Sequence, residues 1–320
     1  MNALRLAAFN GHKNVISRLI IRNVRGINQS DENGTSALHW ASERGYVEVV
    51  QMLLDKGADV NAQGGFLGNP LQGASDGGHA RVVLMLLDRG ANVNAQGGFY
   101  GNALQGASHV GHVRVVQMLL DNGANVNARG GEYGYALLAA SLRGHVTIVK
   151  ALLDKGADVN AQDGRYGNAL RVASGGGHVE IVQMLLDKGA DVNAQVGRCG
   201  NALRAASGEG HVKIVQMLLD NRADVNALGG LYGNALQAAS GGGHIEIVQM
   251  LLDKGANVNA QGRGYFGQYT NALHAASRRG HLKIVQMLLD KGADSNALHA
   301  AFDGRSAKRV KLKADNASTL

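Results

Sequence analysis

Histidine is the residue of this chain that could most readily do chemistry, because imidazole binds metals and transfers protons near neutral pH. The chain has 12 histidines, and eight of them directly follow a glycine, from His12 to His281. With Gly45-Tyr46 counted at the same position, these dipeptides recur at intervals of 34, then 33 six times, then 37 residues. Metal ligands must converge within a few ångströms, whereas packed helices lie roughly 10 Å apart. The spacing therefore predicts a structural role, with each histidine starting a helix and hydrogen-bonding a neighbouring turn.

A serine recurs with the same period, so a nucleophile for covalent catalysis must also be considered. Each copy closes a short segment of the type NALQAAS, and no base and orienting acid recur beside it. We therefore predict that the protein is not an enzyme, and we assign the serines to capping or turn hydrogen bonds. The positions are Ser75, Ser108, Ser141, Ser174, Ser207, Ser240 and Ser277.

Residues 262–267, GRGYFG, match the glycine pattern of dinucleotide-binding loops. Such a site requires a buried strand before the loop and an acidic residue about twenty positions after it. The loop instead follows the polar stretch NVNAQ, and Met287 stands twenty residues beyond Gly267. We expect a decorated loop without a nucleotide, and the sequence predicts no cofactor, metal or small-molecule ligand.

The net charge of +7 is confined to the ends of the chain. Residues 1–30 hold five basic and no acidic residues, and residues 303–320 hold five basic and two acidic ones, which leaves residues 31–302 at −1. Nucleic-acid binding needs a basic surface that neutralises several phosphates, so we expect none by this part. The single cysteine, Cys199, allows no internal disulfide and indicates a reducing compartment. Since no apolar run is long enough to cross a membrane, we expect a soluble cytoplasmic monomer without membrane contact.

Two short helices per repeat must position these residues. In the second segment of a repeat, such as 244–255, apolar residues at i, i+3, i+6 and i+7 from Ile245 form a helical stripe. A glycine follows, as at Gly255, and predicts a left-handed C-terminal cap. Arg222 replaces that glycine in one repeat and should weaken the cap. A glycine-rich tip such as 97–101 then favours a projecting hairpin before the next repeat begins.

The second repeat, residues 31–61, resembles a known family. Residues 36–39 read Ser-Ala-Leu-His where ankyrin repeats have Thr-Pro-Leu-His, and the period matches that family's. The resemblance covers about residues 2–302 and implies an all-α repeat solenoid, in which stacked helix-turn-helix units carry projecting β-hairpin loops. We expect about nine units over residues 1–302, with half-units at both ends, and a basic, disordered tail over residues 303–320.

The resemblance also implies a non-catalytic scaffold for protein–protein interaction, whose partner binds the concave face formed by hairpin tips and first helices. The repeats look similar to fungal arrays that often end NACHT-type NTPases, so the alternative is the sensing array of such a signalling protein. No Walker loop occurs in this chain, so only the array would then be present. Asn61, Asn160 and Asn193 are similar to asparagines that hydroxylases modify in the family, but we expect a local turn role for them.

The positions that vary between repeats are the candidate partner-binding residues. At the third tip position they are Phe66, Phe99, Glu132, Arg165, Arg198 and Leu231. In the first helices and just after them they are His109, Leu142, Arg143, Arg171, Arg204, Glu209, Arg278 and Arg279. The aromatic residues and arginines would suit a protein with an apolar patch and acidic residues; neutral variation on a solvated face is the alternative. The neighbouring tip tyrosines, such as Tyr100 and Tyr133, are expected to stack as a ladder.

The tail contains a K-R-x-K cluster formed by Lys308, Arg309 and Lys311, within residues 308–313. This cluster is similar to a monopartite nuclear localisation signal. We therefore expect part of the protein in the nucleus, and a merely solubilising basic tail is the alternative.

Overall fold

The computed structural model describes residues 2–22, 26–196, 200–229, 233–262 and 271–295. Within these residues the regular elements are α-helices, and the β-structure is limited to isolated bridges. The expected all-α repeat solenoid is confirmed. The chain divides into two compact units, Met1–Asp158 (unit 1) and Val159–Leu320 (unit 2).

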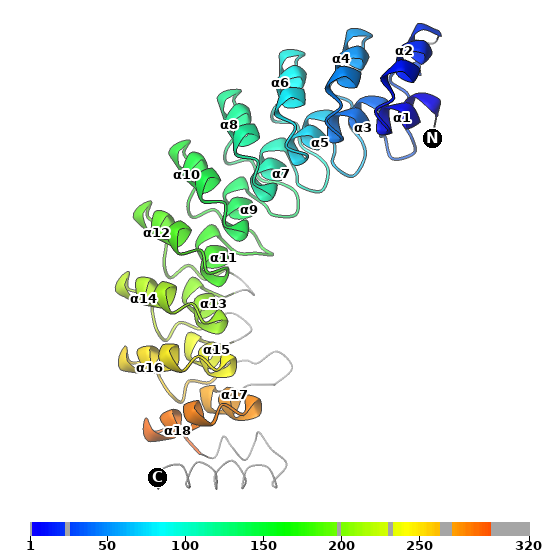
Figure 1. Cartoon of the computed structure of the whole chain (residues 1–320). Coiled ribbons are helices and arrows are strands. Elements are labelled where there is room, and N and C mark those ends of the chain that lie inside the picture. The colour runs from blue at the N-terminus through cyan, green and yellow to red at the C-terminus, as the bar shows by residue number, and fades with distance from the viewer. Residues whose placement is uncertain (1, 23–25, 197–199, 230–232, 263–270, 296–320) are drawn as a thin grey trace. The chain divides into compact units, whose positions relative to one another are not determined.

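In unit 1, each repeat consists of a first helix packed against a second helix (Figure 1). The first helices are α1 (Ala3–Phe9), α3 (Ala37–Glu43), α5 (Pro70–Asp76), α7 (Ala103–Val110) and α9 (Ala136–Arg143). The second helices are α2 (Lys13–Arg22), α4 (Val47–Asp55), α6 (Ala80–Asp88), α8 (Val113–Asp121) and α10 (Val146–Asp154). Neighbouring repeats contact each other mainly through their first helices.

Unit 2 repeats the same arrangement. Its first helices are α11 (Ala169–Gly175), α13 (Ala202–Glu209), α15 (Ala235–Gly242) and α17 (Ala272–Arg279). Its second helices are α12 (Val179–Asp187), α14 (Val212–Asp220), α16 (Ile245–Asp253) and α18 (Leu282–Asp290). The half-unit expected at 296–302, the basic tail and most of the GRGYFG loop lie outside the described residues.

Local sequence explains where these helices begin and end. Asn102 stands at the N-cap of α7, and its side chain accepts a hydrogen bond of 2.9 Å from the backbone N–H of Gln105. The second helices end before a glycine in the left-handed region, such as Gly123 with φ 83°. Arg222 takes this position with φ 64°, and among the described residues it alone has a positive φ without being glycine. Because L-residues are strained there, a weaker cap in this repeat remains our prediction.

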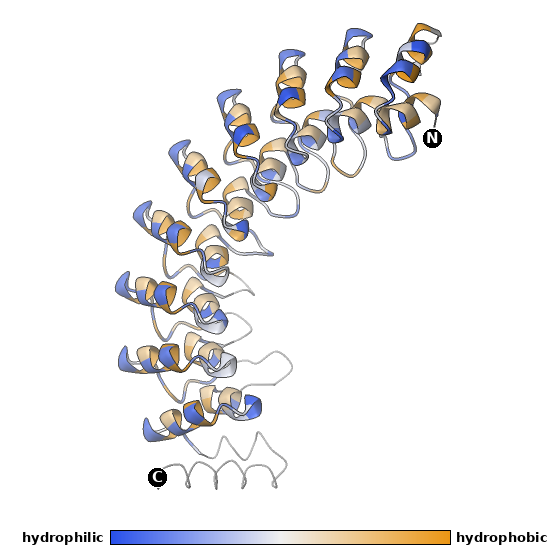
Figure 2. Ribbon diagram, in the orientation of Figure 1, coloured by the Kyte–Doolittle hydropathy of each residue, from blue (hydrophilic) through white to orange (hydrophobic). Residues whose placement is uncertain are grey.

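The core lies between the first and second helices and between neighbouring repeats. Leu119 of unit 1 and Leu185 of unit 2 hold equivalent positions in their second helices, and both are 0% exposed. Figure 2 shows hydrophilic residues at the ends of the second helices that point away from the first helices. Helices this short are unstable alone, so each depends on burial against its neighbours. Across the described residues, none of these helices has the length and apolar character needed to span a bilayer.

The tips are minimal hairpins. Gly64 pairs with Gly68 and Gly97 with Gly101 through single antiparallel bridges, and the positive φ of 72° at Gly65 makes the intervening turn possible. Neighbouring tips are joined by backbone hydrogen bonds, including one of 2.9 Å from the Phe99 N–H to the Phe66 carbonyl. The tips of unit 1 therefore form a connected ribbon rather than independent loops.

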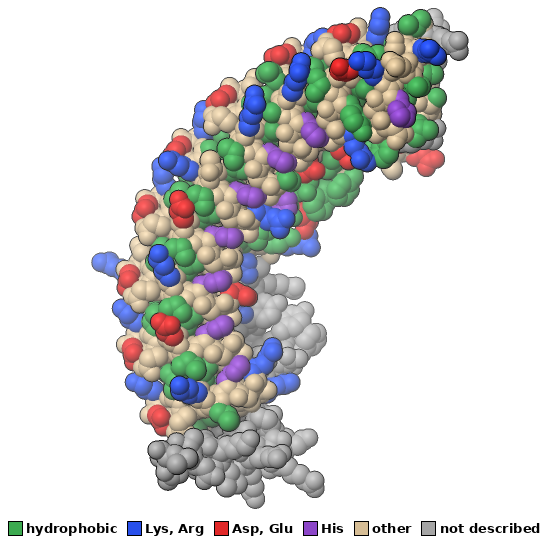
Figure 3. Space-filling view, viewed as in Figure 1, with side chains coloured by type: hydrophobic (Ala, Val, Ile, Leu, Met, Phe, Trp, Pro, Cys, Tyr) green, Lys and Arg blue, Asp and Glu red, His purple; other side chains and the backbone are tan. Residues whose placement is uncertain are grey.

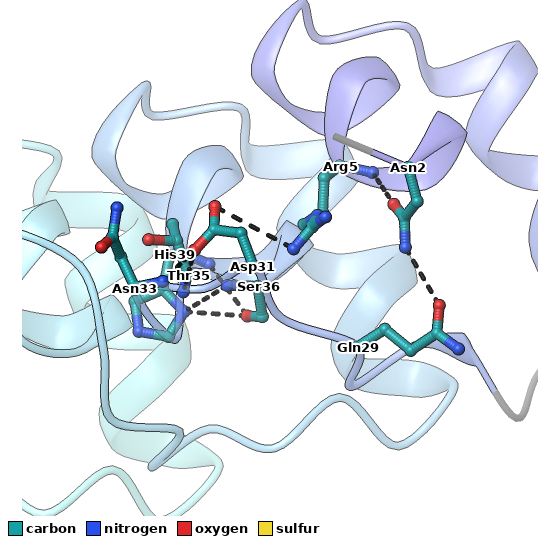
Figure 4. A network of polar contacts seen from close by, with 8 residues as sticks. All are labelled: Asn2, Arg5, Gln29, Asp31, Asn33, Thr35, Ser36 and His39. Carbon is teal, nitrogen blue, oxygen red and sulfur yellow. Dashed lines mark hydrogen bonds and ion pairs between the residues drawn. The ribbon is translucent and has the colours of Figure 1, made fainter.

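The segment before α3 is built differently (Figure 4). The Asp31 carboxylate accepts hydrogen bonds from the backbone N–H groups of Asn33 at 3.1 Å and Thr35 at 2.9 Å, and it lies 3.9 Å from the Arg5 guanidinium. Burial alone would raise the pKa of Asp31, but these hydrogen bonds and the charge of Arg5 lower it below its usual range. Side-chain hydrogen bonds therefore fix this turn, which lacks the adjacent glycines of the later tips.

Candidate functional site

The recurring histidines form hydrogen bonds between neighbouring repeats. From His79 to His281 they stand at the N-cap positions of second helices, and the Nε2 of most of them donates to a carbonyl near the end of the first helix of the preceding repeat, for example His79 to Glu43 at 2.9 Å and His112 to Asp76 at 2.8 Å. Equivalent bonds are made by His145, His211, His244 and His281. Within each unit, Figure 3 shows histidine side chains in a regular row. The predicted structural role is confirmed.

The asparagines of the DVNA segments also bind across repeats. The Nδ2 of Asn61 donates to the Gly90 carbonyl at 3.1 Å, and its Oδ1 accepts from the Asn92 N–H at 2.8 Å. Asn160 and Asn193 make the corresponding contacts in unit 2. The expected turn role is confirmed and extended, because each side chain ties its own turn to that of the next repeat.

The prediction for the serine hydroxyls was wrong. Ser75, Ser108 and Ser207 are 0% exposed, and their Oγ atoms have no hydrogen-bond partner within the described part of the chain. The turn hydrogen bond uses the serine backbone instead, as when the Gly78 N–H donates to the Ser75 carbonyl. Small size rather than hydrogen bonding suits serine to this tightly packed position. Among the described residues, no three His, Cys, Asp or Glu side chains come together as metal ligands.

We define the tip face of each unit as its tips together with its first helices; the tips are 64–68, 97–101 and 130–134 in unit 1 and 163–167 in unit 2. In unit 1 this face carries two of the expected contact residues as an aromatic pair. The rings of Phe66 and Phe99 stack with centroids 5.1 Å apart, although Phe66 is 70% and Phe99 36% exposed. Glu132 follows them on the next tip, half-buried, and its N–H donates to the Phe99 carbonyl at 2.9 Å.

His109 does not lie at the surface, as a contact residue would. It is 8% exposed, and its ring stacks on that of Tyr133 with centroids 4.2 Å apart. Tyr100 stacks on Tyr133 at 6.2 Å, so the expected tyrosine ladder is present between these two tips and includes the histidine. Burial, followed by the charges of Arg143 and His145, lowers the pKa of His109 to about 4. His109 is therefore neutral at physiological pH and supports the tips. Leu142 is half-buried beside the exposed Arg143.

In unit 2 the tip face carries arginines. Arg165 is exposed, and its guanidinium carbon lies 5.5 Å from the centre of the Tyr166 ring. Arg171 on α11 donates to the Tyr166 carbonyl at 3.1 Å, so part of this side chain holds its own tip. Arg204 is half-buried on α13, and Glu209, Arg278 and Arg279 are exposed. Arg198, Leu231 and the tail residues Lys308, Arg309 and Lys311 lie outside the described residues.

A groove on the tip face of unit 1 contains residues that sequence reasoning missed. It has a volume of about 310 Å³ and lies between the tip 64–68 and helices α3 and α5. Its walls include Trp40, Glu43, Asp76 and Tyr100. Glu43 and Asp76 each directly follow the repeat serine. His109 holds the same position in the repeat that comes after that of Asp76. A comparison of this position across the repeats would have identified both carboxylates.

Burial sets the electrostatics of this groove. Burial raises the pKa of Glu43. The charge of Arg44 lowers this pKa, and the charge of Asp76 raises it. Burial also raises the pKa of Asp76, against a hydrogen bond from the Tyr100 hydroxyl. The pKa of Tyr100 is raised by its own burial and then by the charge of Asp76. Two carboxylates that repel each other therefore share this partly desolvated groove.

Comparisons with known proteins agree with this architecture. The family model "Ankyrin repeats (3 copies)" matches residues 1–64, 71–163, 104–196, 137–229, 170–262 and 203–299. The human ASB11 ankyrin repeat domain is a similar solved structure, with a TM-score of 0.61 and 28% identity, and the match covers 70% of this chain and 99% of that one.

Short stretches are also similar to curated proteins. Palmitoyltransferase akr1 of Schizosaccharomyces pombe is 42% identical over 21% of this chain and 10% of that protein. The Drosophila melanogaster ankyrin repeat and KH domain-containing protein mask is 45% identical over 19% of this chain and 2% of its own length. This chain therefore spans a small part of these relatives. The matches show a repeat array, and on this evidence the chain belongs to the ankyrin repeat family.

Proposed function

We propose that this chain is a non-catalytic scaffold that binds a protein partner through its tip face. The observation that supports this most is a division of roles among the repeat positions. The recurring histidines and asparagines make hydrogen bonds between repeats, and the recurring leucines are buried. The varying residues of the tips have no such common role, and Phe66 exposes 70% of its surface. Exposed aromatic side chains beside polar groups are typical of protein interfaces. Ankyrin repeats are, in general, protein-interaction modules.

The two units suggest two kinds of contact with such a partner. The stacked pair Phe66 and Phe99 in unit 1 offers an apolar surface that a partner's side chains could cover. Arg165, Arg278 and Arg279 in unit 2 offer exposed positive charge that attracts acidic residues. The partner that we propose therefore presents an apolar patch together with an acidic segment.

Affinity capture from cell extract, followed by binding measurements with the purified candidate, tests this proposal. A tip-face variant would carry Phe66→Ala, Phe99→Ala, Arg165→Ala and Arg279→Ala. A matched control would change exposed residues of the second helices, namely Arg114→Ala, Lys150→Ala, Lys213→Ala and Lys283→Ala. We expect the tip-face variant to keep its circular dichroism spectrum and to lose at least about tenfold in affinity, while the control binds as wild type. Equal binding by both variants would place the interface elsewhere.

We further propose that the tail cluster Lys308, Arg309 and Lys311 directs part of the protein to the nucleus. Fluorescence microscopy of the tagged chain tests this. Changing the three residues to alanine should abolish nuclear accumulation, and an unchanged distribution would leave the tail with a solubilising role.

A further inference from the structure

The groove between tip 64–68 and helices α3 and α5 has a charge pattern that the scaffold itself does not need. Glu43 and Asp76 end α3 and α5 at equivalent positions, so two carboxylates flank the groove one repeat apart. The carbonyl of each residue is held by a histidine of the next repeat, at 2.9 Å for Glu43 and 2.8 Å for Asp76. Their backbones are therefore fixed before any ligand arrives.

Two residues that line this groove carry a polar atom without a partner among the described residues. The Oδ1 of Asp76 and the Nε1 of Trp40 are buried, and neither has a hydrogen-bond partner in the described part of the protein. An unpaired buried polar atom is costly, so a ligand that satisfies both would be favoured. The carboxylate oxygen requires a donor, and the indole N–H requires an acceptor. A basic side chain on a peptide backbone offers both, because the backbone supplies carbonyl oxygens.

Aromatic rings surround the carboxylates. Trp40 is held in place by Phe9, whose ring meets it edge-on with centroids 5.0 Å apart. Phe66 and Tyr100 line the groove from two successive tips. Aromatic faces attract cations, and the planar, weakly hydrated guanidinium stacks on them better than an ammonium group. The combination of rings and two carboxylates therefore fits arginine better than lysine.

A glycine provides the space for such a side chain. Gly73 lies inside α5, where glycine costs about 1 kcal/mol relative to alanine. A Cβ built at Gly73 would lie 3.4 Å from the Cβ of Glu43, which is an ordinary van der Waals contact. The equivalent residue is alanine in four other repeats, for example Ala139 and Ala275. Alanine would therefore fit at position 73, and its methyl group would take up space in the groove that Gly73 lines.

We propose that this groove holds an arginine side chain of the protein partner, with its guanidinium between Glu43 and Asp76 and against the aromatic rings. This inference rests on the proposed protein-binding function and specifies one contact of that function. The Trp40 N–H then donates to a backbone carbonyl of the partner segment. Unit 1 thus contributes a basic-residue site as well as the apolar surface of Phe66 and Phe99.

The single tryptophan of the chain makes this site directly observable. The probe is the peptide acetyl-Gly-Ser-Arg-Ser-Gly-amide, added to the full ¹⁵N-labelled chain. The matched control peptide contains citrulline, which keeps the shape of arginine without its charge. We expect the indole N–H signal of Trp40 to shift in a saturable way with the arginine peptide and to remain in place with the citrulline peptide. Absence of a shift, or equal shifts with both peptides, would overturn the proposal.

Variants locate the effect within the groove. Asp76→Asn and Glu43→Gln should each weaken binding of the arginine peptide by at least about tenfold, because each removes one charge-assisted contact. Gly73→Ala, which leaves every charge in place, should weaken it by filling the space. Glu180→Gln, an exposed carboxylate on the second helix α12 and away from the tip face, is the control and should bind as wild type. If Asp76→Asn and Gly73→Ala both bind as tightly as Glu180→Gln, the groove is not the site.

The two proposals can fail separately. If the tip-face variant loses the captured partner while Asp76→Asn keeps it with unchanged affinity, protein binding stands and the arginine site is rejected. If neither variant loses the partner, the interface lies elsewhere.

Discussion

Two repeats of unit 1 and two repeats of unit 2 share the same frame but carry charge at different positions of the first helix. After the repeat serine, the unit 1 repeats have Glu43 and Asp76, where the unit 2 repeats have Gly175 and Gly208. At the third helical position, Gln72 of α5 in unit 1 is neutral, whereas Arg171 of α11 in unit 2 is positive. All four helices begin after a serine or asparagine N-cap and bury a leucine at the second position. The scaffold thus fixes which positions can vary, and it leaves the charge at those positions open.

The largest expected effect tests whether the two scaffolds are equivalent. Leu119→Ala in unit 1 and Leu185→Ala in unit 2 each remove a side chain that is 0% exposed. Each should lower the free energy of unfolding by about 2–5 kcal/mol, because a cavity remains. Denaturant unfolding measures both. Costs that differ by several-fold between the two variants would contradict the equivalence of the units.

A smaller effect marks one place where the scaffolds differ. Arg222 in unit 2 has φ 64°, whereas its unit 1 equivalent Gly123 has φ 83°. Arg222→Gly should raise the free energy of unfolding by about 1 kcal/mol by removing left-handed strain, and Gly123→Arg should lower it by a similar amount. Thermal and denaturant unfolding check both changes. A loss of stability in Arg222→Gly would show that the arginine makes a compensating contact.

The pH dependence distinguishes a buried tip from a solvated one. His109 has a pKa of about 4 in the folded chain, below the usual value of 6.5. Its stabilising contribution is therefore complete above pH 6.5 and is lost as the pH falls from 6.5 to 4, since the unfolded chain takes up the proton first. We expect the imidazole signal in an NMR titration to have its midpoint near 4. His109→Gln should lose less stability over this interval than wild type; an equal loss would assign the effect to other groups.

The smallest expected effect concerns the groove carboxylates. Because burial raises the pKa of Asp76, the folded chain is less stable with this carboxylate ionised than it would be without the burial. Asp76→Asn should therefore leave the free energy of unfolding unchanged or slightly higher at pH 7. The exposed Asp55 provides the contrast, since a hydrogen bond from Arg89 and a further one from Gln51 lower its pKa, and Asp55→Asn should be slightly destabilising. A loss of about 1 kcal/mol or more in Asp76→Asn, the size of a typical hydrogen bond, would assign Asp76 to the scaffold.

The repeat period and the apolar stripe of the second helices were sufficient to predict the fold, the position of the histidines and the left-handed position that Arg222 occupies. Packing between neighbouring repeats was not predictable in the same way. His109 was expected at the surface, but two tyrosine rings from successive tips cover it. The serine hydroxyls were expected to bond, but the packed first helices leave them without partners. The groove was not predicted because its lining residues Trp40, Gly73 and Asp76 belong to two repeats and meet only when these repeats stack.

The asparagine contacts have a consequence for how such a protein changes over time. In most repeats the asparagine Nδ2 reaches a carbonyl 29 positions ahead, as from Asn226 to Gly255 at 3.1 Å. Asn259 makes the same contact with Gly292 at 3.0 Å across 33 positions, because the last interval is longer. Extra residues in a tip therefore leave the bonding register intact. Since every repeat presents its neighbour with the same donors and acceptors, genetic exchange can duplicate, delete or lengthen a copy while preserving the joints on either side. The number of repeats and the surface they carry can then be inherited as separate traits.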